Sequence, residues 1–132
     1  MIYLDANIFI FAIMNNKEKG ESCRKILRGV ASGKIDAATS GLTWDEVIYF
    51  LIKRASLKTI KQQSNKILKF PNLIFLKTDL EILEKAEELR TCYGLKPRDA
   101  IHAATAIINK IPKIASDDTD FDKVKELKRV KI

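Results

Sequence analysis

The sequence predicts an α/β fold with a mostly parallel central sheet, because short apolar runs alternate along the chain with longer segments of helical periodicity. The apolar runs cover residues 2–4, 36–39, 73–76 and 113–115, and a last one lies near Val130. We therefore expect a sheet of four to five strands. The chain has 132 residues, of which 46% are hydrophobic, so we expect a single domain over residues 1–132 with a core of its own.

Longer segments between these runs carry the spacing of helices. We expect helices over residues 7–14, 18–31, 43–55, 57–70, 79–92 and 97–108, and a short turn around Phe121. Gly33 and Gly94 follow two of these segments, and glycine commonly stands just past a helix end. Pro71 ends the fourth helix, and Pro97 marks the first turn of the sixth.

Composition limits the environment and the partners. Twenty-four Lys and Arg against 17 Asp and Glu give a net charge of +7, which fits either a solvated lysine-rich surface or attraction to nucleic-acid phosphates. Cys23 and Cys92 lack the spacing of a metal site or a disulfide framework, which favours reduced thiols. No signal-peptide pattern and no apolar stretch of about 18 residues is present, so we expect a cytoplasmic protein that does not interact with membranes.

Acidic residues stand where the predicted strands end or the predicted helices begin. They are Asp5, Glu46, Asp99, Asp117, Asp118 and Asp120. Because the carboxyl ends of parallel strands meet at one edge of a sheet, we expect these side chains to converge. Two carboxylates about 4 Å apart repel by roughly 4 kcal/mol at an effective dielectric of ~20, so such a cluster must protonate, recruit a basic residue or hold a cation. Donor sets made only of oxygen favour Mg²⁺ or Mn²⁺ over zinc.

Each acid also has a purely structural interpretation. Asp5 has the position of a helix cap, and Asp99 suits the positive end of a helix dipole. Residues 43–46 have the pattern of a capping box, in which Glu46 bonds back to Thr43, and residues 78–81 repeat that pattern. For residues 78–81 we predict the capping role. Residues 117–120 also suit a polar turn.

Other catalytic classes find less support. A phosphatase of the DxD type requires an aspartate where Asn7 stands, and a receiver domain requires one after the third strand, where residues 76–78 supply none. No GxxxxGK loop is present for a nucleoside triphosphate. His102 is the only histidine, and we predict that it is a packed or hydrogen-bonded helix residue.

With these positions identified, the chain resembles the PIN domain family and, within it, the VapC-type toxin ribonucleases. The resemblance rests on residues 3–8, 43–47, 95–104 and 115–121, in that order over nearly the whole length, and the third segment is the most specific. It implies a three-layer α/β/α sandwich and a Mg²⁺- or Mn²⁺-dependent endoribonuclease. Such an enzyme hydrolyses single-stranded or structured RNA and leaves a 5′-phosphate and a 3′-hydroxyl.

The resemblance also assigns roles to individual residues. Asp5 and Asp99 match the two principal metal ligands of the family, Glu46 matches its third acid and Asp118 its fourth. The remaining matches are candidate helpers, namely Asn7, Ser116, Asp117 and Asp120. Ala6 departs from the family, which often has threonine at this position.

The partners implied by the resemblance are RNA, an antitoxin protein and a second copy of the chain in a homodimer. Basic residues near the acids are expected to contact the RNA backbone, namely Lys53, Arg54, Lys58 and Arg98. Two alternatives remain open from the sequence. One is a PIN nuclease of RNA processing that is not a toxin, and the other is a non-catalytic module that binds RNA or protein.

Overall fold

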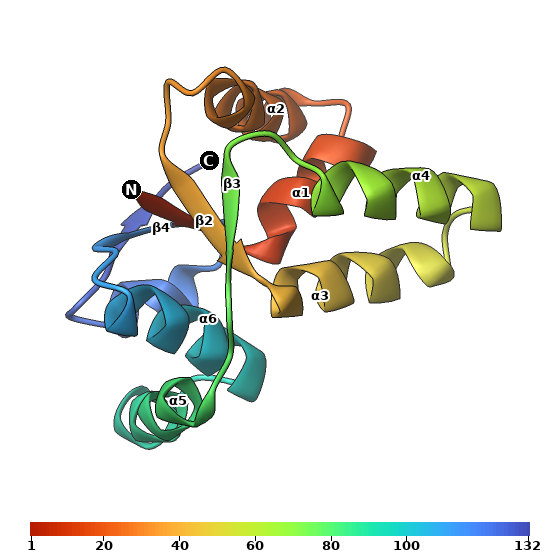
Figure 1. The fold of residues 1–132 in the computed structure, drawn as a ribbon. Coiled ribbons are helices and arrows are strands. Elements are labelled where there is room, and N and C mark those ends of the chain that lie inside the picture. Colours follow the sequence, from red (N-terminus) through yellow and green to blue (C-terminus); the bar gives the residue numbers. More distant parts are fainter.

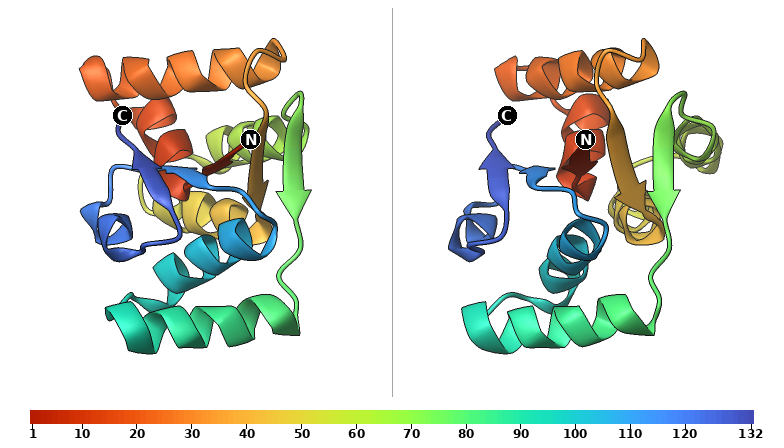
Figure 2. Two further views of the ribbon diagram at one scale, coloured as in Figure 1. Left: turned by 90° about the vertical axis from the view of Figure 1, so that its left-hand side faces the viewer. Right: turned by 60° about the vertical axis from the view of Figure 1, so that its left-hand side comes forward.

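In the computed structural model, which describes residues 1–132, five strands form one fully parallel sheet with the order β3-β2-β1-β4-β5. The strands are β1 (Ile2–Leu4), β2 (Ala37–Ser40), β3 (Leu73–Leu76), β4 (Lys113–Ala115) and β5 (Lys128–Val130). Figure 2 shows β3 and β5 at the two edges of the sheet, with the other strands between them. The predicted α/β class and parallel sheet are confirmed.

Six α-helices and one short 3₁₀ helix connect the strands. They are α1 (Ala6–Met14), α2 (Glu18–Ala31), α3 (Gly41–Ile52), α4 (Leu57–Leu68), α5 (Leu80–Tyr93), α6 (Pro97–Ile108) and η1 (Thr119–Lys123). Most bounds lie within two residues of those predicted. The exception is α3, which begins at Gly41 and ends at Ile52 instead of covering residues 43–55. None of the helices is both long enough and apolar enough to cross a membrane.

The sheet separates two hydrophobic cores, which gives the expected three layers. Tyr3 of β1 and Ile114 of β4 pack into the core formed with α5 and α6. Leu4 and Ala115, the next residues on the same strands, face the opposite way into the core formed with α1–α4. This alternation is the two-residue period of a strand that is buried on both faces. Figure 1 shows the α5–α6 pair lying apart from α1, α3 and α4, with the sheet between them.

Strand register brings the first and fourth strand ends together. Tyr3 pairs with Ile114 and Leu4 with Ala115, and the Asp5 amide donates to the Ala115 carbonyl at 3.1 Å. The chain first builds the sheet outward from β1 through β2 to β3, and then crosses to β4 and β5 on the other side of β1. The boundary between β1 and β4 is therefore the switch point of the sheet, where open α/β sheets bind their ligands.

The capping box predicted for residues 78–81 is wrong, and the alternative interpretation of residues 43–46 as a capping box does not hold either. Helix α3 begins after Ser40, so Thr43 lies inside its first turn, buried, with its hydroxyl 2.7 Å from that of Thr39. Glu46 consequently lies in the second turn and does not cap the helix. At α5 the cap is Asp79, whose carboxylate accepts from the Ile82 amide at 3.1 Å. Both segments contain a threonine followed three residues later by glutamate, but neither helix begins directly after that threonine.

Gly20 lies where α2 approaches Asn15, the residue that caps the C-terminus of α1, and we predict that Gly20→Ala destabilises the protein. An added Cβ would lie 1.9 Å from the carbonyl oxygen of Asn15, and that backbone atom cannot move aside as a flexible side chain can. We expect the free energy of unfolding in urea to fall by about 1–3 kcal/mol.

Gly41→Ala is the matched control for this change. Gly41 begins α3, and nothing lies within 4 Å of a Cβ placed there. We expect this variant to be unchanged or more stable by about 0.4–1 kcal/mol, because alanine restricts the unfolded chain. Equal losses in the two variants would contradict the close approach at Gly20.

Candidate active site

Three of the predicted acids line one open polar pocket of about 500 Å³ at the carboxyl edge of the sheet. Glu46 comes from α3, Asp99 from the first turn of α6, and Asp118 from the turn before η1. The basic residues Lys96 and Arg98 line the same pocket. In Figure 1 the start of α3 lies next to the end of β2, which is how its acid reaches this edge.

Asp5 lies beneath these acids and is only 5% exposed. One carboxylate oxygen accepts from the Ala6 amide at 2.7 Å, so Asp5 caps α1 as its position suggests. The other oxygen accepts from the Ser116 hydroxyl at 2.6 Å. Asp5, Glu46 and His102 also place one polar atom each within 4.8 Å of one another. Capping and membership of the acid cluster are therefore compatible, since they use different lone pairs of one carboxylate.

Ser116 fixes the geometry around Asp5. Its hydroxyl donates to Asp5 and accepts from the Asn7 side-chain amide at 3.1 Å and from the Asp118 backbone amide at 3.0 Å. These three bonds use the proton and both lone pairs of the hydroxyl. The structure therefore places Asn7 and Ser116 beside the acids, and links the end of β1 to the turn that carries Asp118.

His102 is fully buried and bridges the sheet to α3. Its Nε2 lies 2.5 Å from a carboxylate oxygen of Glu46 and 3.5 Å from Asp5, so it donates to Glu46. Its Nδ1 lies 2.8 Å from the hydroxyl of Tyr3, which donates its own proton to Ser40 at 2.9 Å. Both ring nitrogens are therefore engaged in hydrogen bonds, Nε2 with Glu46 and Nδ1 with Tyr3.

The surroundings of His102 favour the protonated form of its ring. Burial alone would lower the pKa of His102, but the hydrogen bond to Glu46 and the charges of Asp5 and Asp99 outweigh burial and leave the pKa above its ordinary value. Burial raises the pKa of Asp5, and the positive charge of His102 and the Ser116 hydroxyl offset only part of this rise. One positive charge thus serves the two innermost carboxylates.

Asp99 is half-buried and lies among other carboxylates, which raise its pKa. Burial first, and then the charges of Asp118 and Asp5, raise its pKa to about 7. Asp99, Asp118 and Asp120 each place a carboxylate oxygen within 4.8 Å of the others. Neither Asp99 nor Asp118 pairs with a Lys or Arg within 4.0 Å. A proton or a bound cation must therefore neutralise this part of the pocket.

The structure separates the three acids of the 117–120 turn. Asp117 does not line the pocket and pairs with Lys19 of α2 at 2.8 Å. Asp120 pairs with Lys123 at 3.2 Å. Asp118 caps η1 by accepting from the Asp120 amide at 2.9 Å, and it has no basic partner. Of the three, only Asp118 both lines the pocket and is free of an ion pair.

The donor set fits a hard divalent cation. The atoms available to an ion are carboxylate oxygens of Asp5, Glu46, Asp99 and Asp118, and hard cations bind to such oxygens. Both ring nitrogens of His102 are already engaged, Nε2 with Glu46 and Nδ1 with Tyr3, so the carboxylate oxygens are the donors left for an ion. Mg²⁺ and Mn²⁺ bind all-oxygen donor sets of this kind more readily than zinc does.

Sequence analysis missed three buried members of this network. His102 is hydrogen-bonded, as predicted, but its place between Glu46 and Asp5 was not foreseen, and the roles of Tyr3 and Ser40 were not considered. The available signal was the position of His102 one turn after Asp99, which puts both side chains on one face of α6. The partner across the pocket, Glu46, is 56 residues away and could not be inferred from local pattern.

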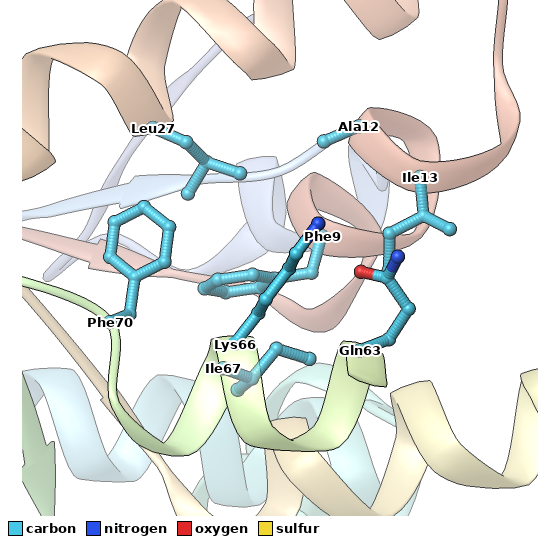
Figure 3. Close-up of a pocket in the computed structure, with 8 residues that line it drawn as sticks. All are labelled: Phe9, Ala12, Ile13, Leu27, Gln63, Lys66, Ile67 and Phe70. Carbon is cyan, nitrogen blue, oxygen red and sulfur yellow. The ribbon is translucent and has the colours of Figure 1, made fainter. Parts of the chain in front are cut away.

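A second hollow, of about 280 Å³, is apolar and separate from the acids. It lies between α1, α2 and α4, where the aromatic rings of Phe9 and Phe70 meet edge to face with centroids 6.3 Å apart (Figure 3). It contains no acid. Six of its eight lining residues are hydrophobic, namely Phe9, Ala12, Ile13, Leu27, Ile67 and Phe70, and the other two are Gln63 and Lys66. Nothing in it suggests hydrolytic chemistry.

Comparison with known proteins identifies the family. The model of the PIN domain matches residues 2–127, nearly the whole chain. The chain belongs to the PIN domain family. Ribonuclease VapC2 of Methanocaldococcus jannaschii is 31% identical, and the match covers 99% of this chain and 93% of that protein. Ribonuclease VapC6 of the same organism is 35% identical over 54% of this chain and 47% of its own length.

Solved structures share the PIN fold of this chain at lower identity. VapBC2 from Rickettsia felis, solved bound to a DNA fragment from its promoter, gives a TM-score of 0.78 at 20% identity and covers 99% of this chain and 98% of that one. VapC20 from Mycobacterium tuberculosis, described as a toxin that cleaves the sarcin–ricin loop, gives 0.77 at 14% identity with 95% coverage of both chains. These likenesses establish the three-layer fold.

The charge balance of the pocket predicts how stability depends on pH when metal is removed. Native Asp99 keeps its proton up to a pH of about 7, whereas the unfolded chain loses it near 3.8, so the native state binds more protons in that window. The free energy of unfolding in EDTA should therefore fall as pH rises from about 4 to 7. The raised pKa of His102 acts in the same direction. The stabilisation that protonated His102 gives the native state is complete below the unfolded pKa of 6.5, and it is lost as the pH rises through the higher native pKa.

Urea unfolding in EDTA at several pH values measures this dependence. Asp99→Asn removes the titrating group and should flatten the decline, and Mn²⁺ should stabilise the wild-type protein most at the alkaline end, where it does not compete with the proton. A free energy of unfolding that rises across this window in EDTA would contradict the charge assignment.

Proposed function

We propose that this PIN domain protein is a metal-dependent endoribonuclease and the toxin of a toxin–antitoxin pair. The observation that carries the proposal is the convergence of carboxylates from separate segments on one polar pocket, where Asp99 and Asp118 have no basic partner. A protein that only docked onto RNA would gain nothing from this repulsion. The relatives named ribonuclease VapC2 and VapC6 support the same chemistry.

In this proposal Asp5, Glu46, Asp99 and Asp118 hold Mg²⁺ or Mn²⁺. When bound, the ion lowers the pKa of a coordinated water and offsets negative charge that develops at phosphorus. The chain itself fixes the ligand atoms before substrate arrives, because Ser116 holds Asp5 and His102 holds Glu46. A water oxygen attacks phosphorus, the bond to the 3′ oxygen breaks, and that oxygen takes a proton, which leaves a 5′-phosphate and a 3′-hydroxyl.

Positive charge next to the acids suits an RNA substrate. Lys96 and Arg98 line the acidic pocket itself, and Lys53 and Arg54 line the hollow beside it. Lys58, which was also considered from the sequence, stands in the first turn of α4 and lines neither of these hollows. The excess of basic residues therefore includes a group next to the reaction site, in addition to the dispersed surface lysines.

An antitoxin is the proposed protein partner. Several structural neighbours are described as toxin–antitoxin complexes, among them one from Klebsiella pneumoniae, and the open apolar hollow of Figure 3 has the chemistry of a protein contact. We also propose that the toxin acts in the cytoplasm as a homodimer. If the small protein encoded beside this one is its antitoxin, co-expression should yield a stable complex with suppressed RNA cleavage. A neighbour that neither binds nor inhibits would contradict the toxin assignment.

Removal of a proposed ligand should abolish cleavage. We expect Asp5→Asn and Asp99→Asn to lose at least about 100-fold in the rate of RNA hydrolysis with Mg²⁺ or Mn²⁺, since loss of outer residues that merely orient metal ligands typically costs 10–100-fold. Asp45→Asn is the matched control, because Asp45 is exposed on α3 directly before Glu46 and lines no part of the pocket.

Calorimetry with Mn²⁺ separates the outcomes. The nuclease proposal requires saturable binding to the wild-type protein and weaker binding to Asp99→Asn. Activity that is equal in the wild-type protein and in both Asn variants would refute it. Absence of saturable Mn²⁺ binding together with retained RNA binding would favour the non-catalytic module.

A further inference from the structure

One exposed aromatic residue beside the acidic pocket is unusual in its surroundings. Tyr49 of α3 is 57% exposed, and its ring carries two cations, with Lys53 Nζ at 5.5 Å and Arg98 Cζ at 5.9 Å from the ring centroid. A second ring, Phe50, has the guanidinium of Arg54 at 3.9 Å. Each of these two neighbouring rings thus has at least one cation beside it.

These residues line a hollow of about 330 Å³ that adjoins the acidic pocket. The hollow is formed by Ile10, Glu46, Tyr49, Phe50, Lys53, Arg54 and Arg98. Glu46 and Arg98 line both hollows, so the two lie side by side. The helical period explains the line of side chains, because Tyr49 and Lys53 follow Glu46 by three and seven residues and share its face of α3.

The cations of this hollow are unusual because they are not neutralised. Lys53, Arg54 and Arg98 form no ion pair within 4.0 Å, although the carboxylates of Glu46 and Asp99 are close by. Lys and Arg next to an exposed aromatic ring are the elements with which proteins hold single-stranded nucleic acid, since the cations contact phosphates and the ring stacks on a base.

We propose that this hollow, the Tyr49 subsite, binds one unpaired nucleotide next to the scissile phosphate. The base stacks on Tyr49, and Lys53, Arg54 and Arg98 contact the flanking phosphates. The inference rests on the proposed ribonuclease function and narrows its substrate, because a base inside a duplex cannot offer its face to the ring. The subsite therefore favours an unpaired segment of RNA over a continuous helix.

Equilibrium binding tests the subsite without requiring catalysis. Fluorescence anisotropy in EDTA would measure the affinity of a short fluorescein-labelled single-stranded RNA, and of the same RNA annealed to its complement. Tyr49→Ala should weaken single-stranded binding by roughly tenfold, the effect of losing one stacked base, and leave duplex binding unchanged. Tyr49→Phe keeps the ring and should retain the wild-type affinity. Lys53→Ala should lower the salt dependence of log K by about 0.7.

Ile52→Ala is the matched control, since Ile52 is an apolar residue of the same helix, 61% exposed, and does not line the hollow. Equal affinities of Tyr49→Ala and Ile52→Ala for single-stranded RNA would overturn the subsite. Sedimentation of the same variants tests the alternative that Tyr49 lies in a subunit interface. A changed oligomeric state, together with equal losses of affinity for single-stranded and duplex RNA, would also overturn the subsite.

RNA cleavage assays with Mg²⁺ and with Mn²⁺ distinguish a failure of the subsite from a failure of the nuclease proposal. If the wild-type protein cuts RNA and Tyr49→Ala binds as tightly as the control, the nuclease stands and the subsite fails. If Tyr49→Ala loses single-stranded binding but the wild-type protein cuts nothing with either metal, the subsite stands and the nuclease fails.

Discussion

Buried His102 makes the hydrogen bonds on which the acidic pocket depends. It donates to Glu46, lies 3.5 Å from Asp5 and contacts Tyr3 of the central strand. Close carboxylates repel by roughly 4 kcal/mol per pair, whereas a whole domain is stable by only ~5–15 kcal/mol. The positive charge that His102 carries below its raised pKa, together with the proton that Asp99 retains up to a pH of about 7, offsets this repulsion and lets the acids converge. The remaining negative charge is what a divalent cation would neutralise.

Topology explains why these groups meet. The parallel register of β1 and β4 places Asp5 beside Ser116, and the change of direction in strand order leaves that edge open instead of covering it with a connection. Helices α3 and α6 belong to opposite layers of the sandwich, yet both begin at this edge. Glu46 and His102 therefore reach each other across the end of the sheet, at a point where neither hydrophobic core intervenes.

Much of the fold and the outline of the site could be predicted from sequence. Apolar runs and helical spacing located every strand and helix. The rule that strand ends meet at one edge, which nearby helix starts also reach, placed Asp5, Glu46, Asp99 and Asp118 in one region. Local pattern could not choose between Asp117 and Asp118, because that choice depends on Lys19, which is 98 residues from Asp117 in the chain. The capping boxes failed for a related reason, since the start of α3 is set by where β2 ends and not by Thr43.

Negative and positive side chains are separated along α3, and this separation bears on what the protein binds. Glu46 stands in its second turn, and Lys53 and Arg54 follow at its C-terminal end, yet these cations do not form ion pairs with the nearby acids. A helix selected only for stability would pair such groups at a spacing of three or four residues. Here the negative charge is gathered at the edge of the sheet, and the positive charge is gathered beside it around exposed aromatic rings. A polyanion that crosses both regions would place one phosphate at the acids, where a cation is required, and its neighbours against Lys and Arg. Separated charge of this kind suits a strand of RNA better than a compact anion or a protein surface.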